Sequence, residues 1–366
     1  MTAGLRRGTT EYLWPTELVR PDDLRLVYLD LNHWISLAKA AVGHADGARY
    51  AAALEALRAA KGSGLFAFPL SSTHFMEVAP AKNPRHRGDV ADVMEELSEF
   101  DVLVSRSVIQ EMEIDAALDV YGRPLGLPYP RVPLLGRGVM RAFGRVGGLK
   151  VWDGEGADVT ARVRAGWPGG GPAAFDRWRE DAERELDRRI LRGPATPEEE
   201  TALRADGWDP IVARRMMTDN ANVERELARW LSTQPHWRTQ RVRDVVSARH
   251  LFLELNEKLA ERLAMRGIEL EELFPARGTA RGFVDAMPSS DVIVSLKAAA
   301  HRNPQTDWTP NRLFDMDALA VAVPYCDFVA TDREAAHALR SERIPDRLGT
   351  TVVATLDDLV DAMTSG

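Results

Sequence analysis

Cysteine is almost absent from the chain: Cys326 is the single thiol among 366 residues. One thiol cannot form a disulfide within the chain, so a disulfide-stapled fold is excluded and a reducing cytoplasm is the natural setting. The opening residues, MTAGLRRGTTEYLW, lack the apolar segment of a signal peptide. No apolar run approaches the roughly 18 residues of a membrane-spanning helix. We therefore expect a cytoplasmic protein without a membrane segment.

Several well-known catalytic motifs are also missing. The stretch Gly144 to Lys150 is not a phosphate-binding loop, because Leu149 stands where that motif requires a glycine. No paired Cys or His spacing predicts a structural zinc site. No Gly-x-Ser-x-Gly turn predicts a serine hydrolase. The segment Asp30-Leu31-Asn32 lacks the second Asp of the haloacid-dehalogenase phosphatases.

The chain as a whole is acidic, and an excess of positive charge occurs only in local stretches. The net charge is −8, which argues against a general nucleic-acid coat protein but leaves room for a nuclease with a local basic face. Cations gather without any acid from Arg131 to Lys150. Four arginines also lie between His236 and His250, beside Trp237 and against Asp244 alone. Such stretches suit phosphate contact and base stacking, although a solvated loop is the ordinary alternative. The candidate nucleic-acid-binding residues are Arg137, Arg141, Arg145, Arg238, Arg241 and Arg243.

Strand-like and helix-like segments alternate at both ends of the chain. This order predicts an α/β fold, in which a parallel β-sheet carries helices on both faces in three layers. Pro69 indicates that the segment 65–70 is an edge strand or the end of a strand. The hydroxyls of residues 71–73 favour the start of a helix directly after it. The predicted strands are 26–30, 65–70, 101–104, 328–331 and 350–354. The predicted helices are 34–42, 46–60, 87–99, 311–323 with Pro324 as its end, 333–341 and 356–363.

The middle of the chain has few strand signals. Its long helical runs, 173–192, 209–232 and 236–265, predict a mainly α-helical insert. We therefore expect three parts. They are the first part of the α/β domain at 24–107, the helical insert at 108–288 and the second part of the α/β domain at 289–366.

Carboxylates lie near the expected ends of several strands and helices. The carboxyl ends of parallel strands share one edge of a sheet, so acids that are distant in sequence can meet there. Such acids repel one another unless a cation neutralises them, and hard oxygen ligands suit Mg²⁺ or Mn²⁺. The candidate metal ligands are Asp30, Glu77, Asp315, Asp317 and Asp332.

Each candidate residue also has an ordinary structural role open to it. Asp30 and Asp332 can cap the helices that follow them, and Asp315 and Asp317 can favour a helix N-terminus. Glu77 can be a surface residue. Two histidines lie next to these acids, and packing or hydrogen bonding is their expected role. They are His33 and His74.

Three segments together resemble a known family. The pattern LVYLDLNHW, then SSTHFMEV, then FDMDALAVAVPYCDFVATD is similar to the PIN-domain ribonucleases, over about 26–105 and 289–363. This resemblance implies a parallel sheet with helices on both faces. It also implies cleavage of RNA with Mg²⁺ or Mn²⁺ at three or four acids, which leaves a 5′-phosphate and a 3′-hydroxyl. The family includes toxins of bacterial toxin–antitoxin pairs, although most simple toxins of this kind are far shorter.

The resemblance also assigns individual residues. Asp30 matches the first acid, Glu77 the second and Asp332 the acid after the last matched strand. Asp315 matches the third acid best, and Asp317 is its rival, because the two point about 200° apart on a helix. By this resemblance the catalytic residues are Asp30, Glu77, Asp315 and Asp332. Thr331 matches the family's threonine at the strand end. Asp327 has no counterpart in the resemblance, and supporting roles are expected for it and for Asn32 and Ser72 on their position alone.

The expected function is therefore metal-dependent hydrolysis of RNA by a metal-activated water. DNA is the alternative substrate of the same fold, and a scaffold whose acids hold no metal is the non-enzymatic alternative. A role as a toxin or defence effector would add an inhibitory, antitoxin-like partner. A homodimer is a further alternative, because small PIN proteins often dimerise.

Overall fold

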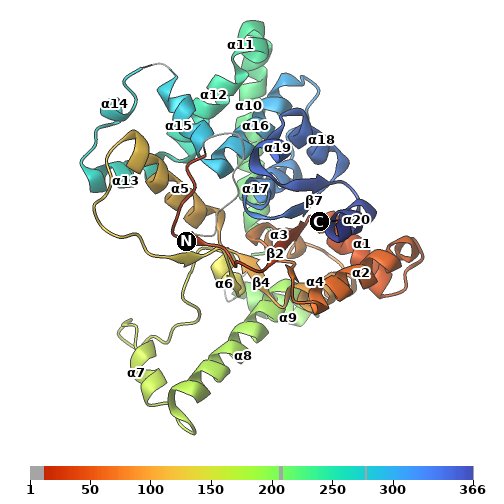
Figure 1. Cartoon of the computed structure of the whole chain (residues 1–366). Helices are drawn as coiled ribbons and strands as arrows, with labels where there is room; N and C mark the ends of the chain where they lie inside the picture. Colours follow the sequence, from red (N-terminus) through yellow and green to blue (C-terminus); the bar gives the residue numbers. More distant parts are fainter. Residues whose placement is uncertain (1–11, 206–208, 277, 366) are drawn as a thin grey trace.

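A computed structural model describes residues 12–205, 209–276 and 278–365 (Figure 1). The fold is mixed α/β, mostly helical, with small parallel sheets. Helices surround the central sheet, and the helices α7 (Thr160–Ala165) and α8 (Gly171–Arg192) form an arm that extends away from it (Figure 1). Within the described residues, no helix combines the length and the apolar character that crossing a membrane requires.

The central sheet has four parallel strands in the order β3-β2-β7-β8. Residues far apart in sequence lie side by side in it: Tyr28 of β2 pairs with Val329 of β7, which pairs with Val352 of β8. Each of the four overlaps a predicted strand, although β2 begins and ends one residue earlier than predicted and β3 is shorter than predicted. The strand bounds are β2 Arg25–Leu29, β3 Phe66–Ala67, β7 Phe328–Ala330 and β8 Thr351–Val353.

Shorter strands extend this arrangement. The predicted strand at 101–104 forms β4 (Asp101–Leu103), which meets Leu70 in a parallel bridge. Its other edge pairs antiparallel with β6 (Leu135–Arg137), a strand within the predicted insert that the sequence did not indicate. A separate parallel pair joins β1 (Leu18–Val19) to β5 (Val132–Pro133).

The strands separate two hydrophobic cores. Side chains alternate along β2, so Val27 and Leu29 belong to one core and Leu26 and Tyr28 to the other. The first core contains residues of α1 (Leu31–Ala41), α2 (Ala51–Gly62), α4 (Pro84–Ser98) and α20 (Leu356–Ser365). The second contains residues of α16 (Pro288–Arg302), α17 (Pro310–Tyr325), α18 (Arg333–Ser341) and α19 (Ile344–Leu348). Helices therefore cover both faces of the sheet.

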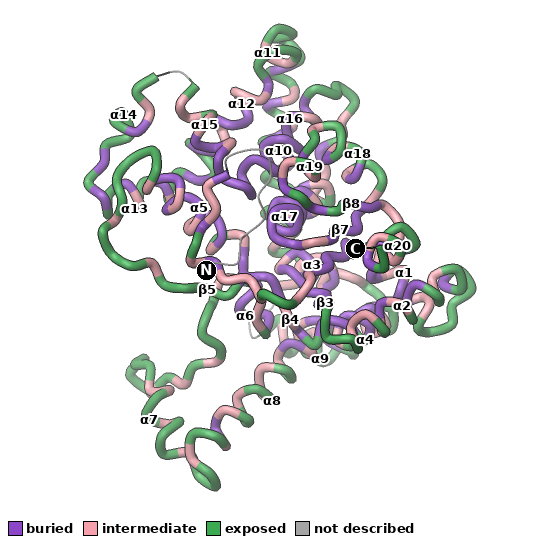
Figure 2. The backbone as a smooth tube through the Cα atoms, viewed as in Figure 1, coloured by how far each residue is buried: buried purple, intermediate pink, exposed green. Residues whose placement is uncertain are grey.

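Two neighbouring helices, α16 and α17, are buried along most of their length (Figure 2). The helix at 311–323 was predicted, but it runs from Pro310 to Tyr325. Pro324 does not end it as predicted, because a proline in the last turn removes one N–H while Cys326 N still reaches Ala322 O at 2.8 Å. The helix α16 was not predicted.

The middle of the chain is helical, as its periodicity indicates. The predicted run 236–265 is broken, however, into α11 (Pro235–Gln240), α12 (Val242–Arg249), a π-helical turn (His250–Glu254) and α13 (Asn256–Arg266). The second core joins this region to the rest, because Leu231 and Val246 share it with Val323. The remaining elements are a 3₁₀ turn (Ala45–Tyr50), α3 (Ser72–Val78), α5 (Arg106–Tyr121), α6 (Val139–Ala142), α9 (Pro197–Ala205), α10 (Val212–Ser232), α14 (Leu270–Leu273) and α15 (Thr279–Ala286).

Candidate functional site

Two acids lie side by side where β2 and β7 end. Asp30 follows β2 and caps α1, accepting a hydrogen bond from Leu31 N at 2.7 Å. Thr331 follows β7, is fully buried, and donates its hydroxyl to Asp30 Oδ2 at 3.4 Å. Asp332 comes next and caps α18, accepting from Ala335 N at 2.8 Å. The parallel pairing of β2 with β7 thus places both carboxylates at the same edge of the sheet.

Two further acids reach this edge from helices. Glu77 lies in the second turn of α3, as predicted, and Asp315 lies in the second turn of α17 rather than at its start. The helices α3 and α17 pack against each other. Glu77 and Asp315 are each partly buried, whereas Asp30 is only 6% exposed. The structure therefore brings together acids from four separate segments of the chain.

The proximity of these carboxylates appears in their ionisation. Burial raises the pKa of Glu77 to about 8, and the charges of Asp315 and Asp30 add to the rise. Burial raises the pKa of Asp315 to about 7, with Asp30 and Asp332 contributing. Burial also raises the pKa of Asp30 to about 6; Asp332 adds to it, while hydrogen bonds from Leu31 and Thr331 oppose it. Each of the four acids thus lies in the field of another, as expected of a functional cluster.

Oxygen donors of this kind suit a hard divalent cation, which would relieve the repulsion that raises their pKa values. Their present spacing is wider than direct ligation requires. Within residues 12–205, 209–276 and 278–365, no three His, Cys, Asp or Glu side chains form a group that could hold a metal ion. The donor chemistry fits Mg²⁺ or Mn²⁺, and the carboxylates would have to move closer together to bind it.

Two other predicted acids do not join the cluster. Asp317 lies two residues after Asp315 and forms an ion pair with Arg106 of α5. Asp327 precedes β7 and accepts hydrogen bonds from Leu26 N at 2.8 Å and from Arg20. It therefore lies at the opposite end of the strands from Asp332. The assignment of Asp317 as a metal ligand is corrected because its carboxylate pairs with Arg106. The assignment of Asp327 as a supporting residue is corrected because it lies at the other end of the strands.

The remaining predicted residues near the acids have structural roles or are exposed. His74 is buried and closes a capping box with Ser71, while its Nε2 lies 2.9 Å from Leu29 O. His33 Nε2 lies 3.2 Å from Thr331 O. Burial lowers the pKa of both histidines, that of His74 to about 4. Ser72 is partly buried in the first turn of α3, and Asn32 is exposed on α1.

A cavity of about 620 Å³ adjoins the acids between α16, α17 and α18. Asp315 and Asp332 line one side of it, so the cavity opens directly beside the cluster. Its apolar residues include Leu296, Met316 and Leu319. Its polar residues include Asn303, Thr306, Asn311, Arg312 and His337. The volume is that of a site for a small organic ligand or for one unit of a polymer.

The predicted nucleic-acid-binding arginines fall into two groups. Arg137, Arg141 and Arg145 line one small cavity together with Arg179 of α8. Arg238 donates to Ala228 O at 3.4 Å, and Arg241 is exposed, with its Nε 2.7 Å from Asp244 Oδ2.

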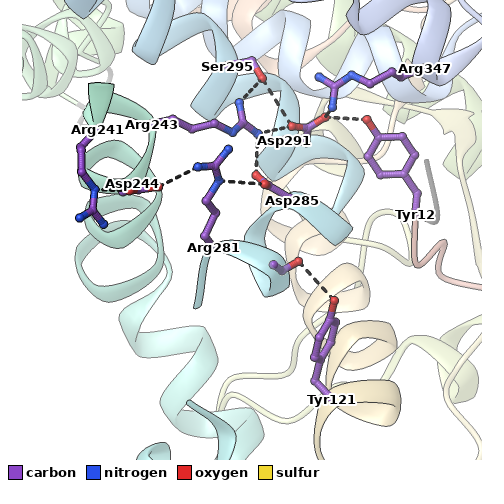
Figure 3. A network of polar contacts seen from close by, with 11 residues as sticks. Tyr12, Tyr121, Arg241, Arg243, Asp244, Arg281, Asp285, Asp291, Ser295 and Arg347 are labelled. Atoms are coloured by element: carbon purple, nitrogen blue, oxygen red, sulfur yellow. Dashed lines mark hydrogen bonds and ion pairs between the residues drawn. The ribbon is translucent and has the colours of Figure 1, made fainter. Parts of the chain in front are cut away.

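Arg243 belongs instead to a polar network around Asp291, a fully buried residue of α16 (Figure 3). Arg243 forms ion pairs with Asp291 and Asp285 and donates to Ser295 Oγ at 2.7 Å. Tyr12 OH and Arg347 Nη1 reach Asp291 Oδ2 at 2.6 and 2.7 Å. Arg243 is therefore held inside the molecule, and its predicted contact with nucleic acid is corrected.

A second polar network on α16 was also missed. Lys297 lies 3.0 Å from Glu224 Oε1 and 2.6 Å from Glu254 Oε1, and His301 Nε2 lies 2.8 Å from Glu224 Oε2. These contacts join α16 to α10 and to the π-helical turn. The sequence signal is the row of polar residues within an otherwise apolar helix, at 289–291, 295, 297 and 301.

Comparison of the chain with protein-family models, with curated proteins and with solved structures finds no match. The expected resemblance to PIN-domain ribonucleases therefore rests on the sequence motifs alone.

Proposed function

We propose that this protein is a metal-dependent endoribonuclease of PIN-like type. The observation that carries the proposal is the convergence of Asp30, Glu77, Asp315 and Asp332 from four distant segments at the ends of parallel strands, with raised pKa values for the first three. Four carboxylates so close together are unfavourable unless a cation or protons neutralise them. These acids are proposed to bind Mg²⁺ or Mn²⁺.

The geometry of the chain supports the family assignment in two respects. The four parallel strands have helices on both faces, which is the architecture that the resemblance implies. The acids also occur in the order of the family's motifs, each at the expected strand end or helix. The helical region 108–288 would then position the substrate or dock an inhibitory partner.

Each residue of the cluster has a distinct task in this proposal. Thr331 orients Asp30 through its hydroxyl, and the first turn of α18 holds Asp332. Glu77 and Asp315 close the site from the two packed helices α3 and α17. Together these carboxylates would hold a divalent ion, which would supply a water of lowered pKa and would neutralise charge on the scissile phosphate.

The cavity beside the acids gives the substrate a place to bind. Its apolar residues suit a nucleobase, and its polar residues suit a ribose or a phosphate. One nucleotide next to the cleaved bond would occupy it. The expected products are a 5′-phosphate and a 3′-hydroxyl.

The direct test is cleavage of matched RNA and DNA strands with Mn²⁺, using wild type, Asp30→Asn and Asp46→Asn. Asp46 is an exposed aspartate away from the cluster and serves as the matched control. The proposal predicts RNA cleavage that Asp30→Asn abolishes and Asp46→Asn preserves. Preferential cleavage of DNA would assign the alternative substrate. Cleavage that Asp30→Asn leaves unchanged would contradict the assignment of the acids, and no cleavage of either strand would favour the scaffold alternative.

A further inference from the structure

A second cavity, of about 180 Å³, lies between α8 and the segment from β6 to residue 149. It is distinct from the cavity beside the acids, and the two share no lining residue. Its charged lining comes from β6, α6, the loop after α6, and α8. The charged residues that line it are Arg137, Arg141, Arg145, Arg179, Glu183 and Asp187.

Arg141 is a buried cation without a counter-charge. Its side chain donates to Pro133 O, but its Nε is buried and has no hydrogen-bond partner. No carboxylate of the described residues lies within ion-pair distance of it, and burial lowers the pKa of its guanidinium. A buried charge without a partner is costly, and an anion bound in the adjoining cavity would offset that cost.

Two more arginines at this cavity also favour an anion as its ligand. Arg179 has a buried Nε without a hydrogen-bond partner, and Arg145 is exposed at the cavity. Neither forms an ion pair with a carboxylate in the part of the chain that the structure describes. Arg137, by contrast, lies 3.6 Å from Glu99 and 3.5 Å from Asp101.

The two carboxylates in the lining are already engaged by the backbone. Glu183 Oε1 accepts Leu149 N at 2.6 Å, and Asp187 Oδ1 accepts Val139 N at 2.7 Å. They hold the loop and the start of α6 in place. Since Arg137 is paired with Glu99 and Asp101, the lining cations without an ion-pair partner among the described residues are Arg141, Arg145 and Arg179.

The loop is built for a close backbone approach. Gly147 and Gly148 both have positive φ, 138° and 73°. A Cβ on Gly148 would come within 2.4 Å of Glu183 Oε1, so either the loop or the Glu183 carboxylate that holds Leu149 N would have to shift. Both glycines line the cavity, which brings main chain as well as guanidinium groups to its wall.

We infer that this cavity binds a phosphate group. Planar guanidinium donors match phosphate oxygens in pairs, and Arg141, Arg145 and Arg179 have no carboxylate partner in the described part of the chain. At about 30 Å³ for one water, the volume holds a phosphate together with a few waters. The phosphate belongs either to a small molecule or to the end of a nucleic-acid strand. The inference does not depend on the activity proposed for the acids.

The test is calorimetric titration of the metal-free protein with three probes: inorganic phosphate, a 5′-mononucleotide and a 5′-phosphorylated single-stranded RNA. The variants are Arg145→Ala and Arg179→Ala. The matched control is Arg177→Ala, an exposed arginine on the same helix that does not line the cavity. Loss of one charged hydrogen bond should weaken binding about tenfold or more in each variant, with the control unchanged.

The probes separate the two sources. Similar affinity for all three identifies a small-anion site, and RNA that binds at least about tenfold more tightly than inorganic phosphate identifies a strand end. Both outcomes support the inference provided that the two variants weaken binding. Absence of binding to every probe overturns it, as does binding that the control lowers as much as the variants do.

Discussion

Asp315 and Asp317 lie two residues apart on α17 and interact with different parts of the molecule. Asp315 lies in the field of Asp30 and Asp332 at the end of the sheet, whereas Asp317 forms an ion pair with Arg106 of α5. Two residues correspond to about 200° around a helix, so the two carboxylates must diverge. This relationship selects Asp315 as the third acid of the proposed site.

The two aspartates should therefore respond differently to the same substitution. Asp315→Asn removes a proposed metal ligand and should lower metal-dependent RNA cleavage at least about 100-fold. Asp317→Asn leaves the cluster intact and weakens a partly exposed ion pair, so it should cost only about 0.5–1 kcal/mol of stability. Cleavage rates and urea denaturation of both variants check this. Equal loss of activity in the two would refute the assignment.

The acid cluster should make the metal-free protein less stable at high pH. The pKa values of Asp30 and Asp315 are raised from 3.8 to about 6 and 7, and that of Glu77 from 4.5 to about 8. At pH values between the unfolded and the folded pKa of each acid, the folded state therefore binds more protons than the unfolded state. The stabilising contribution is complete below about pH 4 and is lost as the pH rises through 6 to 8.

Glu77→Gln isolates this effect, because the amide keeps the shape of the side chain but carries no charge. The free energy of unfolding of the metal-free variant should exceed that of wild type by about 1–3 kcal/mol at pH 8, since one pKa unit corresponds to about 1.4 kcal/mol before screening. The difference should shrink towards pH 5. Urea denaturation in chelator at both pH values measures it, and a difference independent of pH would contradict the cluster.

Local patterns in the sequence indicated the sheet and the acids, because both depend on short-range signals. The strand that ends at Leu29 and the cap at Asp30 follow from an apolar run and a capping residue. Asp327 precedes the same strand that Asp332 follows, and its partners, Leu26 N and Arg20, come from the distant N-terminal part of the chain, which the local pattern did not indicate. Contacts between segments that are distant in the sequence cannot be predicted from local sequence patterns.

The polar residues of α16 show a second limit of the sequence. Their partners lie far away in the chain: Asp291 meets Arg243 and Arg347, and Lys297 meets Glu224. A helix sequence with charges on several sides predicts a solvent-exposed helix. In α16, by contrast, the charged side chains pair with residues on other elements. The same reason explains why Arg243 resembled a nucleic-acid contact.

The network around Asp291 should matter for stability rather than for binding. Arg243→Ala leaves the fully buried Asp291 short of a partner and should cost about 3–5 kcal/mol. Arg241→Ala, two residues earlier, breaks an exposed ion pair and should cost no more than about 1 kcal/mol. Thermal or urea denaturation compares the two. Similar small costs for both would show that Arg243 is not held as the structure has it.

The most direct test of the acid site is Mn²⁺ binding measured by calorimetry at pH 7.5, with and without a 5′-mononucleotide. Wild type is compared with Asp30→Asn/Asp332→Asn, and circular dichroism verifies that both are folded. We predict that wild type binds Mn²⁺ and that the double variant does not. Wild type should bind Mn²⁺ more tightly at pH 7.5 than at pH 5.5, because the acids must lose their protons to bind the ion. Equal binding by both proteins, or no binding by wild type under either condition, would contradict the proposed metal site.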